Sequence, residues 1–169
     1  MERPLTPSTA VGSDVYVAPG ARLIGDVRLA SESSVFHGTL LRGESAPIEV
    51  GAQANIQDNC IVEATPGHPV RIGARVSLGH NARVYGATIE DHSLIAIGAT
   101  VLPGARVGTN SIVAANATVP ENVQVPPRTL VIGHGRILRP VTEAEIERIE
   151  HGADEYVRLG RDYLRTISR

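Results

Sequence analysis

The stretch 61–86, IVEATPGHPVRIGARVSLGHNARVYG, contains three side chains of the kinds that move protons. Glu63 carries a carboxylate, His80 an imidazole and Tyr85 a phenol. Brought together, these groups would supply a base, an acid and a hydrogen-bond donor for acid–base chemistry on a small organic molecule. A guanidinium nearby, such as that of Arg42, can hold a substrate carboxylate or stabilise an enolate.

A six-residue repeat indicates which elements position these side chains. Hexads run through 11–46, 50–62, 72–84 and 89–125, each opening on an aliphatic residue and carrying mostly small residues at the fifth position. Nineteen such positions can be read: Val11, Val17, Leu23, Leu29, Val35, Leu41, Val50, Ile56, Val62, Ile72, Leu78, Val84, Ile89, Ile95, Val101, Val107, Val113, Val119 and Val125. The turn-rich segment ATPGHP (64–69) interrupts the repeat.

This period is typical of a parallel β-helix, in which each hexad is one short strand and a corner. Three hexads make one triangular coil, so about six coils are expected, stacked at roughly 4.8 Å. The first-position aliphatic fills the prism, and Gly, Asn and Asp after it suit corners with positive φ. Cys60 occupies a fifth position and is expected to be packing.

The pattern changes after residue 130. TEAEIERIEHGADEYVRLGRDYLRTI (142–167) has apolar residues at helical spacing, and Thr142 with Glu145 forms a capping box. Gly152 and Gly160 weaken this helix, so it needs a surface to lie on. The sequence therefore predicts one domain: a β-helix over 1–130, a connector over 131–141 and a packed C-terminal helix over 142–169.

Composition excludes several classes of protein. The net charge is −2 and no long basic run appears, which argues against a nucleic-acid partner or an acidic membrane surface. A single cysteine rules out an intrachain disulfide. The N-terminus MERPLTPSTA has no signal-peptide core, and no apolar run approaches the ~18 residues of a membrane span. A cytoplasmic protein is expected.

Several motifs together resemble one family, the γ-class carbonic anhydrases. The hexads alone are shared with many acyltransferases, whereas LRGE, NIQD and LGHNARVYG are far more specific. The resemblance covers nearly the whole chain and rests on ARLIGDVRL (21–29), LLRGE (40–44), PIEVG (47–51), NIQD (55–58), GHPVRIG (67–73), SLGHNARVYG (77–86), LIAIGATVL (94–102), SIVAANATVP (111–120) and EYVRLGRDYL (155–164).

The resemblance implies a homotrimer of left-handed β-helices with an active site at each subunit interface. Two histidines from one subunit and one from its neighbour would hold zinc, iron or cobalt. These positions fall at Glu63, His80 and Tyr85. The family's polar helpers fall at Arg42, Gln57 and Asp58, and the acidic residue of its LRGD motif is Glu44.

Two of the three ligand histidines are thus replaced. A carboxylate can replace an imidazole, but a phenol, whose pKa in water is near 10, must lose its proton to bind a metal. Its anion would also reduce the charge that acidifies a bound water. His68, in the 64–69 loop, offers a substitute, so a metal-bound form would use His80, Glu63 and His68. We expect no resident metal, which favours acid–base chemistry by Glu63, His80, Tyr85, Arg42, Gln57 and Asp58.

Other interpretations remain open. A metal-dependent carbonic anhydrase or acyl-CoA thioesterase could use the altered ligand set. The trimer could also be a scaffold or binding protein in which the site has decayed, with Arg42 and Asp58 forming an inter-subunit salt bridge and Tyr85 filling volume. His37, His92, His134 and His151 are expected at surface or corner positions. No phosphate-binding glycine loop is present.

Overall fold

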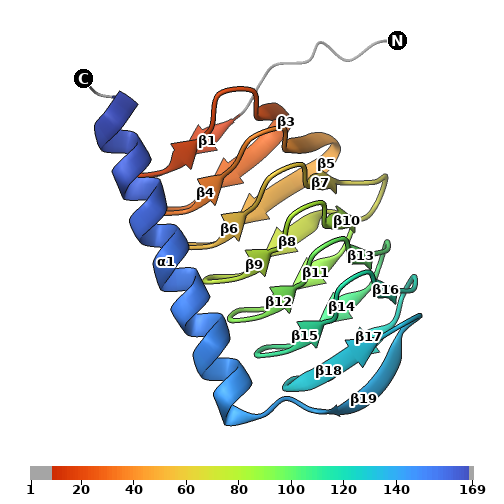
Figure 1. Ribbon diagram of the computed structural model, residues 1–169. Helices are drawn as coiled ribbons and strands as arrows, with labels where there is room; N and C mark the ends of the chain where they lie inside the picture. Colours follow the sequence, from red (N-terminus) through yellow and green to blue (C-terminus); the bar gives the residue numbers. More distant parts are fainter. Residues whose placement is uncertain (1–8, 168–169) are drawn as a thin grey trace.

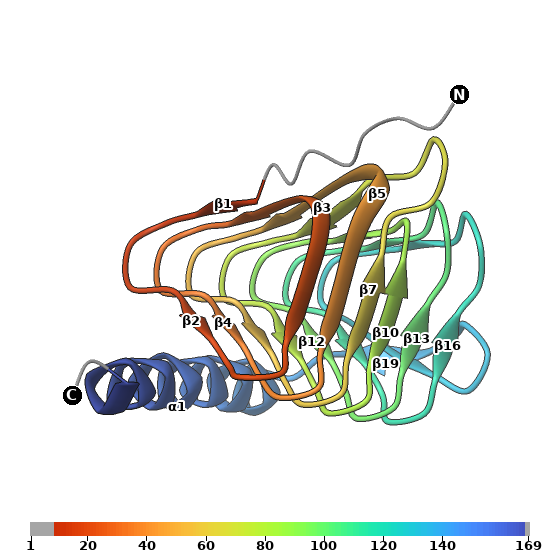
Figure 2. The ribbon, with the colours of Figure 1, turned by 90° about the horizontal axis from the view of Figure 1, so that it is seen from above.

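The computed structural model describes residues 9–167 as a left-handed parallel β-helix with one long helix along its side (Figure 1). Residues 1–8 of the expected β-helix segment and residues 168–169 of the expected helix lie outside the described part. Figure 2 looks along the stack and shows the turns one behind another with the helix beside them. No helix in the described part is both long and apolar enough to cross a membrane.

One flat face of the prism shows how many turns the chain makes. Seven short parallel strands stack on this face in chain order, which gives about seven turns, one more than the hexads predicted. These strands are β2 (Tyr16–Val17), β4 (Ser34–Val35), β6 (Asn55–Ile56), β9 (Ser77–Leu78), β12 (Leu94–Ile95), β15 (Ile112–Val113) and β18 (Thr129–Ile132). The last of them pairs antiparallel with β19 (Arg136–Pro140), which occupies part of the expected connector.

The other two faces form one continuous sheet, because the longest strands bend around the corner between them. β3 (Arg22–Leu29) and β5 (Leu40–Val50) run through this corner and pair in parallel. The remaining strands of this sheet are β1 (Ala10–Val11), β7 (Ile61–Glu63), β8 (Val70–Ile72), β10 (Arg83–Tyr85), β11 (Thr88–Ile89), β13 (Thr100–Val101), β14 (Arg106–Val107), β16 (Thr118–Val119) and β17 (Gln124–Val125).

The core confirms the reading of the hexads. Every first-position aliphatic from Leu29 to Val125 is buried, whereas Val11, on the uncovered first turn, is 52% exposed. Small branched side chains suit this interior because each turn offers only a narrow triangular space. Cys60 is fully buried there, and burial raises the pKa of its thiol to about 12.

One corner of the prism is built in the left-handed backbone region at every turn. Its residues have φ between 55° and 60°, although most are not glycine or asparagine: Asp14, Glu32, Gln53, Arg75, His92, Asn110 and Arg128. Such a conformation costs about 1 kcal/mol per residue. Side-chain contacts along the corner and with the helix offset this cost, and we call this column the charged corner.

Helix α1 (Glu143–Ile167) lies along the charged corner and covers part of the seven-stranded face. Arg75 bonds Gln53 (2.8 Å), Glu150 (2.7 Å) and Asp154 (2.8 Å), and Arg161 pairs with Glu32. Near the C-terminal end of the helix, Tyr163 stacks on Tyr16, with ring centroids 5.0 Å apart.

The capping box at the start of α1 is confirmed. The Thr142 amide donates to Glu145 Oε2 (2.9 Å), and the Glu145 amide donates to Thr142 Oγ1 (3.3 Å). The guanidinium of Arg139 also donates to both carboxylate oxygens of Glu145. These contacts hold the pKa of the Glu145 carboxyl at about 2.

Candidate functional site

Three of the predicted site residues lie in one row across adjacent strands. Arg42 of β5 is in register with Glu63 of β7, which is in register with Tyr85 of β10. The strand spacing of about 4.8 Å therefore separates neighbours in this row. Together with Glu44, these residues form what we call the Glu63 edge.

Arg42 lies between two carboxylates but donates no close hydrogen bond to either. Its Nε is 3.5 Å from Glu44 Oε2, and its Nη1 is 3.9 Å from Glu63 Oε1. Both distances exceed those of ordinary N–H···O hydrogen bonds. The Nε atom is also buried without a hydrogen-bond partner among the described residues. Neither neighbouring carboxylate thus holds the Arg42 guanidinium by a close hydrogen bond.

A second cluster lies at the corner before β7 and β10. Asp58 Oδ2 is 3.1 Å from His80 Nδ1, and Asp58 Oδ1 is 3.4 Å from His37 Nδ1 and accepts the His37 amide at 3.1 Å. We call these three residues the His80 corner. A carboxylate at Nδ1 favours the tautomer in which Nδ1 carries the hydrogen, which leaves Nε2 free to accept a proton or bind a metal.

The Glu63 edge and the His80 corner are separate within one chain. Asp58 precedes Glu63 by five residues, and His80 precedes Tyr85 by five, so a whole strand lies between them, about 15 Å along the chain. Accordingly, residues 9–167 contain no group of three or more His, Cys, Asp or Glu side chains arranged to hold a metal.

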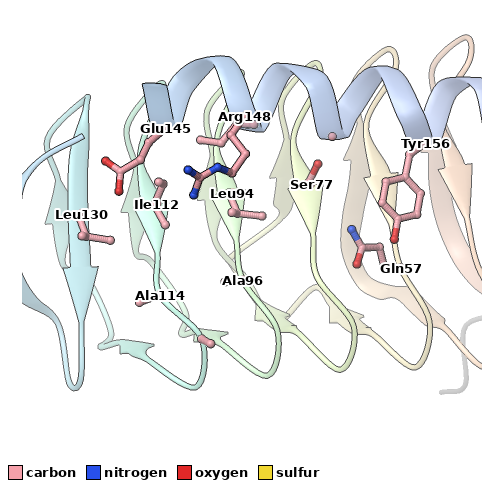
Figure 3. Close-up of a pocket in the computed structure, with 13 residues that line it drawn as sticks. Gln57, Ser77, Leu94, Ala96, Ile112, Ala114, Leu130, Glu145, Arg148 and Tyr156 are labelled. Atoms are coloured by element: carbon pink, nitrogen blue, oxygen red, sulfur yellow. The ribbon is translucent and has the colours of Figure 1, made fainter. Parts of the chain in front are cut away.

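The side chain of Gln57 belongs neither to the Glu63 edge nor to the His80 corner. Its side chain is buried on the seven-stranded face, where its Nε2 donates to Asn55 Oδ1 at 3.1 Å. Figure 3 shows Tyr156 of α1 reaching down towards Gln57. A groove runs from this point between α1 and the sheet. Gln57 therefore lines the groove, while the adjacent Asp58 belongs to the His80 corner.

The 64–69 loop borders the Glu63 edge. Thr65 and His68 exchange backbone hydrogen bonds of 3.1 and 2.9 Å, which closes a tight turn. His68 is exposed, and its Cβ lies against Gly86, the residue after Tyr85. A side chain at Gly86 would collide with the loop, since a Cβ there would lie 2.6 Å from His68 Cβ. His68 thus lies next to the end of β10, against the residue that follows Tyr85.

One member of the His80 corner was missed by the sequence analysis, which placed His37 among surface or corner residues. His37 does lie at a corner, but it contacts Asp58 there. The available signal was spacing: His37 precedes Asp58 by 21 residues, which is one turn of this part of the stack. Of the other histidines, His92 contacts Glu150 (2.5 Å) and His151 contacts Glu155 (3.4 Å).

Comparison with known proteins identifies the family. Residues 86–121 match the bacterial transferase hexapeptide family (six repeats). A protein of Methanocaldococcus jannaschii named "Probable carbonic anhydrase" is 43% identical over 150 residues, covering 88% of this chain and 94% of that protein. The chain belongs to the γ-carbonic anhydrase family.

Three further matches agree with this assignment. The carbonic anhydrase of Geobacillus kaustophilus is 36% identical, covering 90% of this chain and 85% of its own. Gamma carbonic anhydrase 2 of Arabidopsis thaliana mitochondria is 37% identical, and the match spans 57% of that longer protein. A hexapeptide transferase family protein from Anaplasma phagocytophilum superposes with a TM-score of 0.89 at 33% identity, covering 93% of each chain.

The residues present do not fit the three-imidazole coordination that the γ-carbonic anhydrase resemblance implies. Of the three ligand positions, only the one at His80 carries an imidazole, and the contact with Asp58 leaves its Nε2 available. The Glu63 carboxylate lies beside the Arg42 guanidinium, which competes with a metal for its charge. Tyr85 contributes a phenol, which binds a metal only after losing its proton.

Proposed function

We propose that this protein catalyses metal-independent acid–base chemistry on a small organic substrate, in clefts where the His80 corner of one subunit meets the Glu63 edge of the next. The reaction would be of the isomerase, cyclase, lyase or hydrolase type. The observation that carries the proposal is the contact between Asp58 and His80, because it prepares the opposite nitrogen of the imidazole to act as a base.

Each group has a role in such a reaction. His80 Nε2 would take a proton from the substrate while Asp58 stabilises the imidazolium that forms. The Tyr85 hydroxyl would donate a hydrogen bond to a substrate oxygen as negative charge develops on it. Arg42, whose part-exposed guanidinium makes no close hydrogen bond to Glu44 or Glu63, would hold that oxygen or a carboxylate. The His80 imidazolium would pass that proton to the Glu63 carboxylate, which would return it at a second atom of the substrate. Both groups are thereby restored, and the isomerisation proceeds without a net change of charge.

A second candidate is a metal-dependent carbonic anhydrase or thioesterase that uses an altered ligand set. The 43% identity to the M. jannaschii protein favours it, because that protein's name specifies carbonic anhydrase activity. In this alternative, His80, Glu63 and His68 would hold the metal, with His68 in place of Tyr85. Zinc would then supply a bound hydroxide at neutral pH.

Elemental analysis separates the two candidates. The protein, purified without a histidine tag, is incubated with zinc, iron or cobalt, dialysed and assayed for metal per subunit. The proposal predicts much less than one metal per subunit in every case. Near one per subunit, with measurable hydration of CO2, would overturn it in favour of the second candidate.

A third outcome, a scaffold without catalysis, is tested by two conservative variants. Glu63→Gln and Tyr85→Phe remove a proton-transfer group and a hydroxyl while changing little volume. If both variants form native trimers by light scattering and support the biological process of the wild-type protein equally well, the catalytic proposal is wrong. A wild-type protein that is monomeric at micromolar concentration would also exclude the composite cleft.

A further inference from the structure

The groove beneath α1 has about 390 Å³ of space and lies outside the cleft just proposed. Its floor is the outer surface of the seven-stranded face, where Leu94, Ile112 and Leu130 come from the adjacent strands β12, β15 and β18. Its roof is the inner side of α1 (Figure 3). A volume above 300 Å³ is within the range of sites that hold small organic ligands.

The groove exists because the helix does not fill the space over this floor. α1 packs mainly against β2, β4, β6 and β9, so its N-terminal half passes over β12, β15 and β18 with little contact. Among the helix residues that line the roof, Gly152 has no side chain, and nothing lies within 4 Å of the position its Cβ would take. The three aliphatic side chains of the floor are therefore only partly covered.

Two charged side chains lie at the roof, and only one has a partner. The Glu145 carboxylate accepts hydrogen bonds from Arg139 and the start of the helix, which satisfies its charge. Arg148 makes no hydrogen bond or ion pair among the described residues, and Figure 3 shows it reaching over the floor between Leu94 and Ile112. An unpaired guanidinium above an apolar strip is complementary to an anion that carries an apolar chain.

The length of the strip limits the size of that chain. Leu94, Ile112 and Leu130 cover two strand spacings, or roughly 10 Å, and Leu130 of β18 is the last residue of the floor that lines the groove. Towards the other end, Ser77 and Gln57 make the floor polar. A medium-length alkyl chain suits the apolar part, with its charged head placed at Arg148.

We propose that this groove binds a medium-chain fatty carboxylate, with the alkyl chain on Leu94, Ile112 and Leu130 and the carboxylate on Arg148. Two observations carry the inference: the groove left open beneath α1 over an aliphatic floor, and the unpaired guanidinium over the same floor. The site is independent of the acid–base cleft, because neither Arg148 nor Gly152 takes part in it.

Isothermal titration of the assembled protein with decanoate, below its micelle concentration, tests the proposal. We expect saturable binding of one decanoate per subunit, with decanol binding about three- to fivefold more weakly and decylamine more weakly still. The preference for decanoate over decanol should shrink as salt is raised. Arg148→Gln should reduce decanoate affinity to that of decanol and leave decanol unchanged.

A filled groove provides the second arm. Gly152→Leu places a side chain in the empty space and should weaken decanoate and decanol binding at least tenfold. Gly160→Ala is the matched control, since it replaces another helix glycine whose added Cβ would meet Tyr16 and Ser34 at ordinary distances of 3.5–3.6 Å, away from the groove. The proposal would be overturned if the wild-type protein showed no saturable binding, as it would if a neighbouring subunit occupied the groove. It would also be overturned if Gly152→Leu bound decanoate as tightly as the wild-type protein.

Discussion

His80 and Asp58 contact each other across two successive turns of the β-helix, with 3.1 Å between the imidazole Nδ1 and the carboxylate Oδ2. The backbone hydrogen bonds of the parallel turns fix this distance, because Asn81 donates to the Asp58 carbonyl at 3.0 Å. The imidazole is therefore oriented before any ligand arrives. Pre-orientation of this kind reduces the cost of reaching a reactive geometry.

The contact predicts a specific tautomer. In neutral His80 the hydrogen should reside on Nδ1, and Asp58→Ala should shift the population towards the Nε2–H form. Nitrogen-15 NMR of the imidazole measures both states directly. His151 is the internal control, because its Nε2 faces Glu155 and should not respond to the substitution. A wild-type His80 that already carries its hydrogen on Nε2 would contradict the proposed role of Asp58.

Restoring the missing histidines should create a metal site. In the double variant Glu63→His and Tyr85→His, three imidazoles become available at each interface, and we expect about one zinc per subunit after dialysis. The single variant Glu63→His should bind less, since the phenol remains. Elemental analysis gives the result. A double variant that forms a trimer but stays free of metal would show that the Glu63 edge and the His80 corner do not meet as proposed.

Arg75 tests the energetics of the charged corner. Arg75→Ala removes its bonds to Glu150 and Asp154 but keeps a Cβ in the left-handed region, whereas Arg75→Gly removes the bonds and relieves the backbone. We expect Arg75→Ala to lower the free energy of unfolding by about 1–3 kcal/mol, allowing for solvent screening. Arg75→Gly should lose about 1 kcal/mol less. Urea denaturation compares them, and a glycine variant less stable than the alanine variant would refute the account.

Glu145 links stability to acid pH. Its carboxyl pKa falls from 4.5 to about 2 on folding, chiefly through hydrogen bonds from Arg139. Because the folded pKa is the lower one, the stabilisation is complete above about pH 4.5 and is lost as pH falls towards 2. Glu145→Gln should therefore be less stable than wild type at pH 7, and the difference should vanish near pH 2. Glu147→Gln, an exposed neighbour, is the control for acid unfolding curves.

The β-helix could be predicted from the sequence because its interior imposes one aliphatic side chain per hexad. The corner residues could not, since Arg75 and His92 have left-handed backbones that their residue types disfavour and that side-chain contacts offset. For the site, the register of Arg42, Glu63 and Tyr85 follows from strand pairing. Their separation from His80 could not be predicted. It depends on whether a residue lies at the corner before a strand or at the end of that strand, and the motifs LRGE and NIQD do not encode this.

The path of α1 has a consequence for how the molecule folds. In a simple stack, each turn contacts only its neighbours, so turns can unravel from an end one after another. Here Arg161 and Tyr163, near the end of the chain, contact Glu32 and Tyr16 in the first turns. The helix therefore couples the two ends of the stack into one cooperative unit. The turns that contain Tyr16 and Glu32 are therefore fully secured only once the C-terminal half of α1 has packed against them.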